Sequence, residues 1–481
     1  MSAIRGPLTL VAISVLLLIA ARPARGQTEV LLYTFCSQPN CADGEAPASS
    51  LTRDGAGNFY GTTALGGANM QGTVFEISPN GAGGYNETVL YSFCSVNNCA
   101  DGNDPTSTLI FDGTGNLYGT ACSGGANGQG VASACGDGFN GYGVVFELSP
   151  EPGGGCPSGS NSGNGWCETV LYNFASTPDG ASPFAGITWD SSGNLYGTTY
   201  AGGRGMGTVF ELSPSGKGGW SESVLYSFCA QAKCADGAYP DGQVQSMNGT
   251  FYGTTETGGA SAAGTVFGLS PKPPGGCPGG SYTGNGWCEA ILHAFAGHPK
   301  DGNYPAGTPV LDSAGNIYGT TLYGGNGRCE PIKGCGTVWK LTLSGGEYSE
   351  SVLHSFMSGP GLFGCCFSIQ APDLPSAGVV LDGSGNLYGM TTYGGSPSYC
   401  QEKGARAEQQ GCGAMFELVK RPKGTKYTTD LLWIFSWMNG AHPVSSMIVN
   451  GGSFYGTTYD GGLGDFCPYP DGCGIAFEFT P

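Results

Sequence analysis

One phrase, Gly-Asn-Leu-Tyr-Gly-Thr-Thr, recurs with small changes along the whole chain and restricts its possible folds more than any other feature. A fixed phrase that returns about every 66 residues is typical of a repeat architecture, in which each copy builds one structural unit. The number of copies therefore predicts seven units. Their Tyr-Gly pairs begin at Tyr60, Tyr118, Tyr196, Tyr252, Tyr318, Tyr388 and Tyr455.

Each unit contains four segments with the composition of β-strands. In the second unit these segments are residues 87–93, 107–111, 116–120 and 144–148, which are rich in β-branched and aromatic residues and separated by glycine-containing turns. The Leu-Tyr-Ser-Phe and Val-Phe-Glu-Leu segments also occur seven times. Four short antiparallel strands per unit, with no helical segment, predict an all-β fold, a seven-bladed β-propeller.

The two ends of the repeat region predict how this ring closes. The region begins with a Leu-Tyr-Thr-Phe segment and ends with a strand over residues 475–479. Propellers hide their open strand edges by closing the ring. We therefore expect residues 29–35 to form the outermost strand of the seventh blade. The alternative is that each unit forms its own blade without shared closure.

The expected strand order assigns the loops to two faces of the ring. We place the Leu-Ile-Phe segment innermost, then Asn-Leu-Tyr-Gly, then Val-Phe-Glu-Leu, with Leu-Tyr-Ser-Phe outermost. Successive antiparallel strands reverse direction, so the Cys-x4-Cys loops and the long variable insertions should share one face. Two near-duplicate insertions, residues 156–167 and 277–288, should lie on the opposite face.

Residues 1–26 have the features of a signal peptide. Arg5 precedes an apolar run from Leu8 to Ala21, and Ala24-Arg25-Gly26 offers small residues for cleavage. The apolar run is short for a membrane span, although an uncleaved anchor is the alternative. We expect residues 27–481 to form a single, monomeric propeller domain without a membrane span after cleavage. Its expected location is secreted or extracellular, with the periplasm as the alternative.

The twenty cysteines predict disulfide bonds, because cysteines in an exported chain normally pair. Zinc binding would need clusters of Cys and His, and with only four His in the chain we expect no metal site. The adjacent Cys365 and Cys366 are left over, either as a strained disulfide or as a free reactive pair. The expected pairs are Cys36 with Cys41, Cys94 with Cys99, Cys122 with Cys135, Cys156 with Cys167, Cys229 with Cys234, Cys277 with Cys288, Cys329 with Cys335, Cys400 with Cys412, and Cys467 with Cys473.

The charge of the chain excludes one class of partner. The formal net charge is −18, and signal cleavage would remove three Arg residues and no acid. A strongly acidic surface repels phosphate backbones, so we expect no nucleic-acid partner.

The repeated blocks resemble a known family. The Gly-Asn-Leu-Tyr-Gly-Thr-Thr, Gly-Thr-Val-Phe-Glu-Leu-Ser-Pro and Val-Leu-Tyr-Ser-Phe blocks, from Val30 to Pro481, closely resemble the GloVer-type (choice-of-anchor) tandem repeat proteins of bacteria. That resemblance implies an exported protein, commonly tethered by one of several C-terminal anchors, with no established biochemical activity. Because Pro481 directly follows the final strand, we expect a freely released protein instead.

Two residue classes are candidate binding groups. An aspartate begins an Asp-Gly-x-x-Pro motif in five units, where it either forms a turn or offers a carboxylate to a cation or a sugar hydroxyl. A tryptophan lies beside a cysteine in each near-duplicate insertion, where it either caps its own loop or stacks on a sugar. These candidates are Asp43, Asp101, Asp179, Asp236, Asp301, Trp166 and Trp287.

A second set of aspartates, in the turns before Asn-Leu-Tyr-Gly, has a simpler interpretation. A short acceptor at this position bonds nearby backbone amides, whereas a dedicated calcium loop would show Asp-x-Asp-x-Asp spacing. We therefore predict a turn role, with calcium binding as the alternative. The set comprises Asp54, Asp112, Asp190, Asp312 and Asp382.

No pattern of catalytic residues stands out, and no cofactor is predicted. We expect an extracellular binding or scaffold module for a glycan, a peptide or another surface partner. One alternative is a polysaccharide hydrolase or lyase with residues drawn from several blades. Another is a structural protein of the envelope or matrix, because fold alone does not decide function.

Overall fold

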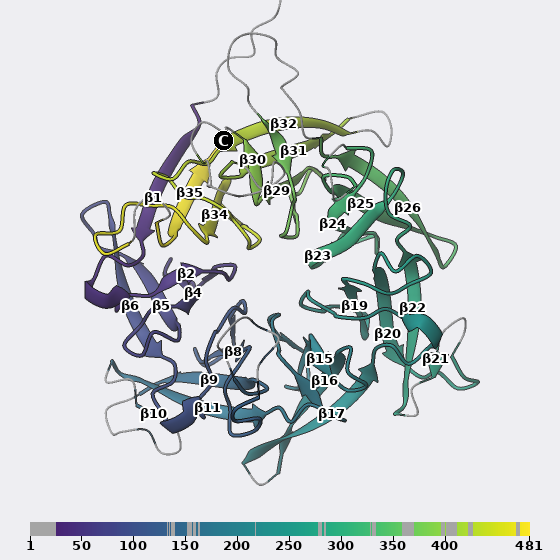
Figure 1. Cartoon of the computed structure of the whole chain (residues 1–481), viewed down its shortest axis with the longest axis horizontal. Coiled ribbons are helices and arrows are strands. Elements are labelled where there is room, and N and C mark those ends of the chain that lie inside the picture. The colour runs from purple at the N-terminus through teal and green to yellow at the C-terminus, as the bar shows by residue number, and fades with distance from the viewer. Residues whose placement is uncertain are drawn as a thin grey trace, which may run out of the picture.

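Short runs of β-branched and aromatic residues, separated by glycine turns, form seven antiparallel four-stranded sheets in a ring, as predicted (Figure 1). The computed structural model describes residues 26–481 except 132, 134, 136–139, 152–155, 157–159, 162–163, 217, 278–280, 283–284, 328, 330–332, 358–369, 396–399, 401–410, 422–426 and 468–471. The helices in this described part are three short 3-10 helices: η1 (Pro39–Cys41), η2 (Asn97–Cys99) and η3 (Ala232–Cys234).

Each sheet is one blade, and the strands of the first three blades, from innermost to outermost, are as follows. Blade 1 contains β2 (Glu45–Pro47) and β3 (Thr52–Arg53), β4 (Phe59–Leu65), β5 (Thr73–Pro79) and β6 (Tyr85–Ser92). Blade 2 contains β7 (Ile110–Phe111), β8 (Leu117–Ala121), β9 (Val144–Pro150), β11 (Trp166–Asn173) and the added β10 (Ser160–Asn161). Blade 3 contains β13 (Thr188–Trp189), β14 (Leu195–Thr199), β16 (Thr208–Ser215) and β17 (Gly219–Ser227).

The remaining blades repeat this order. Blade 4 contains β18 (Gln245–Met247), β19 (Thr250–Thr255), β20 (Thr265–Pro271), β22 (Trp287–Ala294) and the added β21 (Ser281–Tyr282). Blade 5 contains β23 (Gly302–Leu311), β24 (Ile317–Gly324), β25 (Thr337–Ser344) and β26 (Glu347–Ser355). Blade 6 contains β28 (Val380–Leu381), β29 (Leu387–Thr391), β31 (Ala414–Lys420) and β32 (Tyr427–Ile434). Blade 7 contains β33 (Ile448–Asn450), β34 (Ser453–Thr458), β35 (Ile475–Thr480) and β1 (Thr28–Thr34).

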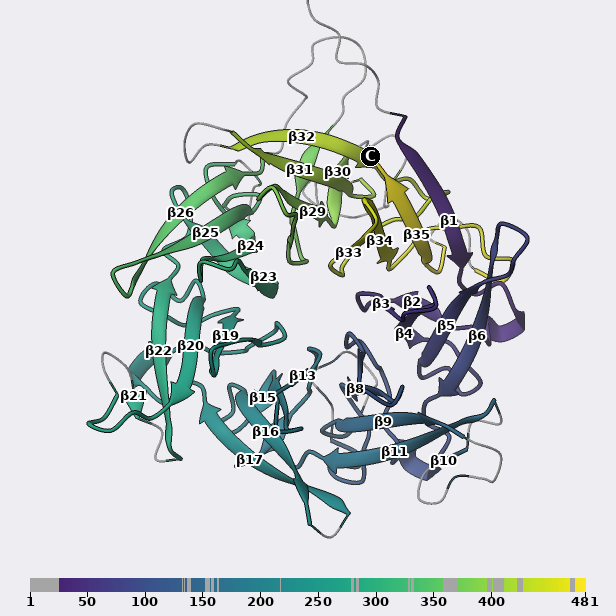
Figure 2. The ribbon, with the colours of Figure 1, turned by 180° about the vertical axis from the view of Figure 1, so that it is seen from behind.

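Two small sheets supplement the blades. They pair β12 (Gly180–Ala181) with β15 (Ala201–Gly202), and β27 (Gln370–Asp373) with β30 (Tyr393–Gly395). From behind, β3, β13, β23 and β33 lie toward the centre of the ring and β1, β6 and β17 toward its rim (Figure 2). This confirms the predicted order of strands within a blade.

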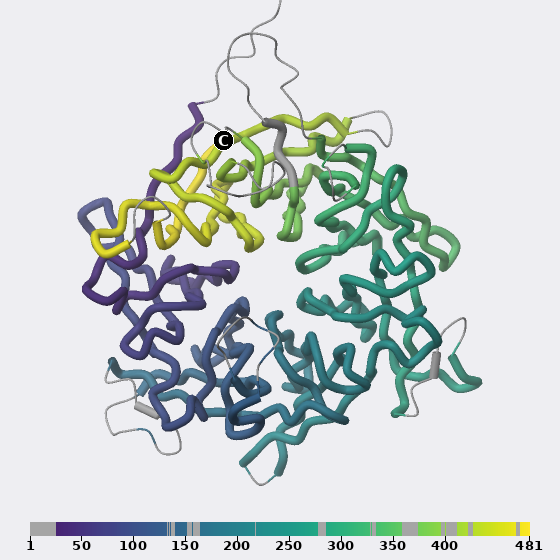
Figure 3. Tube along the Cα trace, in the orientation of Figure 1, coloured from purple at the N-terminus to yellow at the C-terminus, as the bar shows by residue number. Residues whose placement is uncertain are grey.

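The N-terminal strand closes the ring, as the sequence predicts. β1 pairs antiparallel with β35, so the two ends of the described chain lie side by side (Figure 3). Thr457 of blade 7 also donates a hydrogen bond of 2.9 Å from its Oγ1 to the Ser49 carbonyl of blade 1. The alternative without shared closure is therefore wrong.

The hydrophobic core lies between neighbouring blades. The tyrosine of the repeated phrase packs against an aromatic residue of the next blade, as Tyr196 does against Phe251, with ring centroids 4.2 Å apart. The same contact crosses the closure, where Phe59 and Tyr455 have centroids 4.6 Å apart. Each repeated tyrosine therefore binds one blade to another, which explains its recurrence by packing.

The glycine after that tyrosine is required by close packing. A Cβ added to Gly61 would lie 2.6 Å from the Phe75 ring, which crosses directly over the glycine from the neighbouring strand. The same crowding occurs in all seven blades, so the Tyr-Gly pair is a signature of the blade core. The other glycine and ring pairs are Gly119 with Phe146, Gly197 with Phe210, Gly253 with Phe267, Gly319 with Trp339, Gly389 with Phe416 and Gly456 with Phe477.

Every outermost strand contains a β-bulge at the leucine of the Leu-Tyr-Ser-Phe segment. In β17, Val209 pairs with Tyr226 but Phe210 pairs with Val224, so Leu225 is the extra residue. An extra residue reverses which side of the sheet the following side chains occupy. Residues before and after the bulge therefore face different neighbouring blades. The bulge residues are Leu32, Leu90, Leu171, Leu225, Leu292, Leu353 and Leu432.

All nine near-neighbour cysteine pairs form disulfides, as predicted. Cys365 and Cys366 lie outside the described residues. The nine disulfides are consistent with an extracellular or periplasmic location, where thiols oxidise. Within the described residues, no helix is both long enough and apolar enough to cross a membrane.

Candidate functional site

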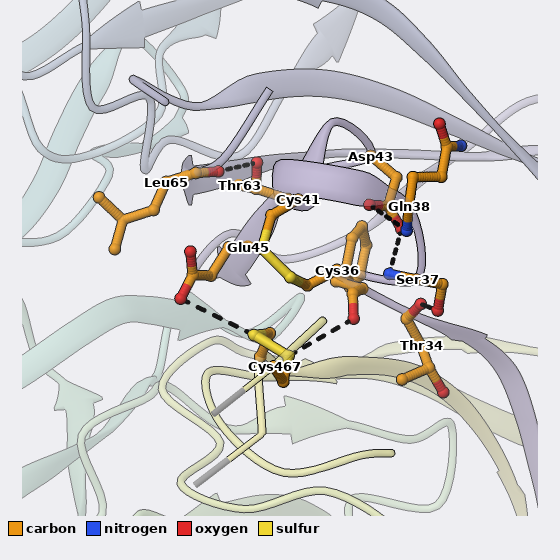
Figure 4. The surroundings of a disulfide bond; sticks show 12 residues. Thr34, Cys36, Ser37, Gln38, Cys41, Asp43, Glu45, Thr63, Leu65 and Cys467 are labelled. Atoms are coloured by element: carbon orange, nitrogen blue, oxygen red, sulfur yellow. Dashed lines mark hydrogen bonds between the residues drawn. A yellow bond between two sulfur atoms is a disulfide. The ribbon is translucent and has the colours of Figure 1, made fainter. Parts of the chain in front are cut away.

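The five aspartates of the Asp-Gly-x-x-Pro motif lie between blades, each in a loop that leads from one outermost strand into the next blade. Asp101 accepts hydrogen bonds from the Tyr91 hydroxyl at 2.7 Å and the Ser95 amide at 2.8 Å, and it is 1% exposed. Asp43 likewise accepts bonds from the Ser37 and Gln38 amides beside the Cys36–Cys41 disulfide (Figure 4). These carboxylates fix the stapled loops to the tyrosines of the outermost strands.

A glutamate from the following blade completes each of these sites. Glu168 lies three residues before the bulge in β11 and therefore faces the preceding blade, where Asp101 lies. Burial, and then the negative charge of Asp101, raise the pKa of Glu168 to about 9. We call each set of tyrosine or histidine, aspartate and glutamate an acid junction. The corresponding aspartate and glutamate pairs are Asp43 with Glu87, Asp179 with Glu222, Asp236 with Glu289, and Asp301 with Glu350.

The acid junctions keep the five predicted aspartates apart instead of gathering them into one site. Each aspartate belongs to a different pair of blades, and its hydrogen bonds are local. A structural role is therefore sufficient to explain why this residue recurs. Ligand binding by Asp43, Asp101 and Asp236 remains a prediction.

Asp179 and Trp287 do come together, at a groove of about 610 Å³ on the outer side of blade 3. The wall is formed by β17, including Glu222, and by Glu211 of the adjacent strand β16. Asp179 lies on the side of blade 2, and Trp287 comes from blade 4. The groove thus combines residues of three consecutive blades.

The hairpin between β20 and β22 of blade 4 brings Trp287 to this groove. The Cys277–Cys288 disulfide closes the hairpin, and the Asn285 side chain donates a hydrogen bond of 2.6 Å to the Val224 carbonyl of β17. Trp287 also packs against Phe251, with centroids 5.8 Å apart. The hairpin therefore reaches back over the preceding blade.

A twin hairpin in blade 2 repeats this arrangement. It is closed by the Cys156–Cys167 disulfide, and its Asn164 side chain donates to the Val89 carbonyl of blade 1. Trp166, its tryptophan, packs against the core between blades 1 and 2. Trp166 is thus the structural counterpart of Trp287 but lies outside the groove along β17.

Three carboxyl groups give the groove a negative character. Burial, and then the charge of Asp179, raise the pKa of Glu222 to about 7. Burial also raises the pKa of Asp179, although hydrogen bonds from Gly180, Tyr172 and Ala175 offset part of this effect. Among the described residues, no Lys or Arg lines the groove. The groove can therefore accept hydrogen bonds from hydroxyl or ammonium groups on a ligand.

A further aromatic and acidic cluster lies at the inner ends of blades 3 to 5. Tyr200 stacks on Tyr239 with centroids 4.9 Å apart, and its hydroxyl donates a bond of 3.0 Å to Glu256. Burial, and then the charge of Asp241, raise the pKa of Glu256 to about 7, while the bond from Tyr200 lowers it. Burial raises the pKa of Tyr200, to which Tyr304 also contributes, and burial and then the charge of Glu256 raise the pKa of Tyr304.

Sequence reasoning missed this inner cluster. Tyr239 and Tyr304 each precede the proline of an Asp-Gly-x-x-Pro motif and have a positive φ of 59°. The equivalent position holds Ala46, Asp104 or Ser182 in other blades, again with positive φ. This position keeps an unusual backbone conformation, while its side chain changes from blade to blade. The change of side chain is visible when the repeats are compared, and it is the signal that points to a functional position.

The turn aspartates have the predicted role. Asp54 accepts bonds from the amides of Ala56, Gly57 and Asn58 at 2.9, 2.7 and 2.9 Å. These bonds outweigh the effect of burial and lower the pKa of Asp54. The carboxylate therefore closes its own turn.

Comparison with solved structures finds matches at low sequence identity and low TM-score. A protein from Lactobacillus plantarum has 11% identity and a TM-score of 0.44, with 95% of this chain and 100% of that chain covered. The PQQ-bound aldose sugar dehydrogenase of Streptomyces coelicolor has 10% identity and a TM-score of 0.40, with 96% and 100% covered. The N-terminal domain of Nup159 has 8% identity and a TM-score of 0.41, with 95% and 96% covered.

Comparison with sequences identifies the repeat itself. No curated protein sequence matches the chain. The sequence family described as the Gloeobacter/Verrucomicrobia repeat matches residues 133–283, which span parts of blades 2 to 4. Residues 133–283 therefore match the Gloeobacter/Verrucomicrobia repeat, within a chain whose sheets form a seven-bladed propeller.

Proposed function

We propose that this protein is a secreted glycan-binding module and that the groove along β17 holds the glycan. The carrying observation is that Trp287, Asn285 and the carboxyl groups of Asp179, Glu211 and Glu222 line one groove of about 610 Å³. A sugar ring presents an apolar face that stacks on an aromatic side chain and hydroxyl groups that bond to carboxylates and amides. The volume is within the range of small-ligand sites.

The charge of the groove favours neutral or amino sugars. The titratable residues that line it within the described part of the chain are all acidic, and the whole chain has a formal net charge of −18. Carboxylates repel sulfated or uronic-acid glycans, whereas they bond equally well to hydroxyl groups and better to ammonium groups. We therefore expect glucans, chitin-type polymers or chitosan-type polymers to bind more tightly than acidic polysaccharides.

The expected location supports this function. The predicted signal peptide over residues 1–26 would export the chain, and nine disulfides would keep its loops rigid outside the cytoplasm. An exported, rigid propeller reaches polysaccharides outside the cytoplasm. Rigid hairpins also lose little entropy when a ligand binds.

A glycan array probed with residues 27–481, followed by titration of the best ligand, tests this proposal. Trp287→Ala should weaken binding by at least about tenfold, because an aromatic platform is typically a dominant contact. Its matched control is Trp166→Ala in the twin hairpin, which should bind within about twofold of the wild type. Equal affinity of the wild type and Trp287→Ala for every ligand would refute the groove as the binding site.

A second candidate function is polysaccharide cleavage at the inner cluster. The specific observation is the pairing of Glu256, whose pKa is raised to about 7, with the nearby carboxyl group of Asp241. Glycosidases use a pair of carboxyl groups, one protonated and one ionised. Because burial raises the pKa of Asp241 as well as that of Glu256, one of the two would have to ionise for this chemistry. Turnover of an array ligand that is abolished in Glu256→Gln would establish catalysis. The absence of both binding and turnover on every glycan would favour a structural role.

A further inference from the structure

The acid junction between blades 4 and 5 differs from the others because a histidine replaces the tyrosine. His293 lies in β22, Asp301 in the following loop and Glu350 in β26. The His293 Nε2 atom is 3.1 Å from Asp301 Oδ2. Ligand-type atoms of His293, Asp301 and Glu350 all lie within 4.8 Å of one another. One nitrogen and two carboxylates thus converge from three separate segments.

We propose that His293, Asp301 and Glu350 bind one Zn²⁺ ion. Zinc takes imidazole nitrogen and carboxylate oxygen at about 2.0–2.2 Å, which in a tetrahedron places ligand atoms about 3.3 Å apart. The 3.1 Å between His293 Nε2 and Asp301 Oδ2 is already close to that value. Because the ligand-type atoms of all three residues lie within 4.8 Å of one another, only a small movement of side chains would bring them to that spacing. A water molecule or a ligand atom would occupy the fourth position.

The glutamate of this junction has an unsatisfied oxygen, as do the glutamates of the other acid junctions. Glu350 Oε1 is shielded from solvent and has no hydrogen-bond partner among the described residues, and the Oε1 atoms of Glu87, Glu168, Glu222 and Glu289 share this condition. A shielded carboxylate oxygen without a donor is costly. A divalent cation would satisfy this atom and also cancel the repulsion between the two carboxylates.

The backbone around the junction holds the aspartate in a suitable orientation. The Ala296 amide donates to Asp301 Oδ2 at 2.8 Å, and the Gly302 amide donates to Oδ1 at 2.6 Å. Supporting bonds of this kind hold a metal ligand in a fixed orientation.

Other junctions show what the histidine changes. Tyr33, Tyr91, Tyr172 and Tyr226 occupy the equivalent position in four acid junctions and donate their hydroxyl hydrogens to the aspartates. Burial is the main cause that raises the pKa values of these tyrosines. They therefore stay protonated, which disfavours metal binding. The chain itself shows that tyrosine folds well at this position.

The next junction provides a natural comparison. His354 occupies the equivalent position in blade 5, but its Nδ1 bonds to Thr429, which replaces the glutamate, at 2.8 Å. Burial lowers the pKa of His354 to about 4. With threonine in place of the glutamate, this histidine has one carboxyl group fewer beside it than His293 has. The other metal-type groups among the described residues all contain disulfide-bonded cysteines.

Measurement of zinc binding by untagged residues 27–481 tests the proposal. The protein is first stripped of metal with a chelator, and binding is then measured by calorimetry and by metal analysis after dialysis. The wild type should retain one zinc per chain, and its melting temperature should rise as zinc is added. His293→Tyr restores the tyrosine of the other junctions and should weaken zinc binding by at least about tenfold. Glu350→Gln should do the same, whereas the control His354→Tyr should bind zinc as the wild type does.

The folding of each variant is checked by circular dichroism and by its melting temperature without zinc. A wild type that binds no zinc, or prefers Ca²⁺ or Mn²⁺, would overturn the assignment of zinc. Zinc that stays bound to His293→Tyr with unchanged affinity would overturn the assignment of the ligands. Because the groove along β17 lies at another junction, neither outcome depends on whether the protein binds glycans.

Discussion

A single buried aspartate can fix a whole junction between blades. Asp101 accepts bonds from Tyr91, Ser95 and Val96 and so joins the end of one outermost strand to the loop that enters the next blade. Removing such an acceptor leaves several donors unsatisfied away from water. The repetition of this residue follows from the repetition of the junction.

Asp101→Ala should therefore destabilise the protein by about 3 kcal/mol, since it strands buried donors. The control Asp112→Ala removes a solvent-facing turn acceptor and should cost only about 1 kcal/mol. Urea unfolding followed by fluorescence measures both values. An equal loss of stability in the two variants would contradict the assigned role of Asp101.

The N-terminal strand offers an adjacent pair of residues with opposite environments. Leu32 is 5% exposed and packs between blades 7 and 1, whereas Leu31 is 51% exposed. Leu32→Ala should cost about 3 kcal/mol through lost burial and a cavity, and Leu31→Ala less than about 0.5 kcal/mol. Thermal and urea unfolding compare them. Similar costs would show that β1 does not pack into the ring as described.

At the scale of elements, comparison of the two twin hairpins distinguishes an effect on stability from an effect on glycan binding. Each disulfide closes a loop of similar length. Removing either one should therefore lower the free energy of unfolding by about 3 kcal/mol. The two double variants are Cys277→Ser with Cys288→Ser, and Cys156→Ser with Cys167→Ser. Only the Cys277 and Cys288 pair fixes the hairpin that carries Trp287. Glycan titration should show weaker binding in that double variant alone. Equal affinities in both variants would argue against the groove.

Local patterns are enough to predict most of the elements. The strands, turns and nine disulfides follow from residues close together in the sequence, such as Cys94 and Cys99, and the ring follows from the number of repeats. The bulges do not follow, because alternation alone would place Glu222 and Tyr226 on the same side of β17. The extra residue Leu225 instead directs them to different junctions.

The candidate sites were predictable only in part for the same reason. Trp287 and Asp179 were candidates, but their meeting depends on a hairpin of blade 4 that reaches over blade 3. His293 and Glu350 meet only because neighbouring blades stack in one register. No spacing within one repeat encodes contacts between different repeats.

At the scale of the whole molecule, the acid junctions recur round the ring and also take part in its closure. In the closing junction, Asn439 replaces the aspartate and donates a bond of 3.0 Å to Glu29. Burial raises the pKa of Glu29 to about 7, and the bond from Asn439 partly offsets this. Buried carboxyl groups therefore lie between blades in the closing junction as well as in the acid junctions.

This property predicts how the stability of the ring depends on pH. Burial raises the pKa of Glu87 and Glu289 to about 8 and that of Glu168 to about 9, from the ordinary value of 4.5. Above about pH 4.5 the unfolded chain loses these protons while the folded ring keeps them, so stability falls with rising pH. The contribution is fully present below the unfolded pKa and is lost as pH rises through the folded values.

The most direct test of the acid junctions is the free energy of unfolding of residues 27–481, measured with urea in the presence of chelator from about pH 5 to about pH 9. We predict a continuous fall over this range and a smaller fall in Glu168→Gln, which removes the titration of the most strongly shifted glutamate. A free energy of unfolding that stays constant or rises from about pH 5 to about pH 9 would contradict the account.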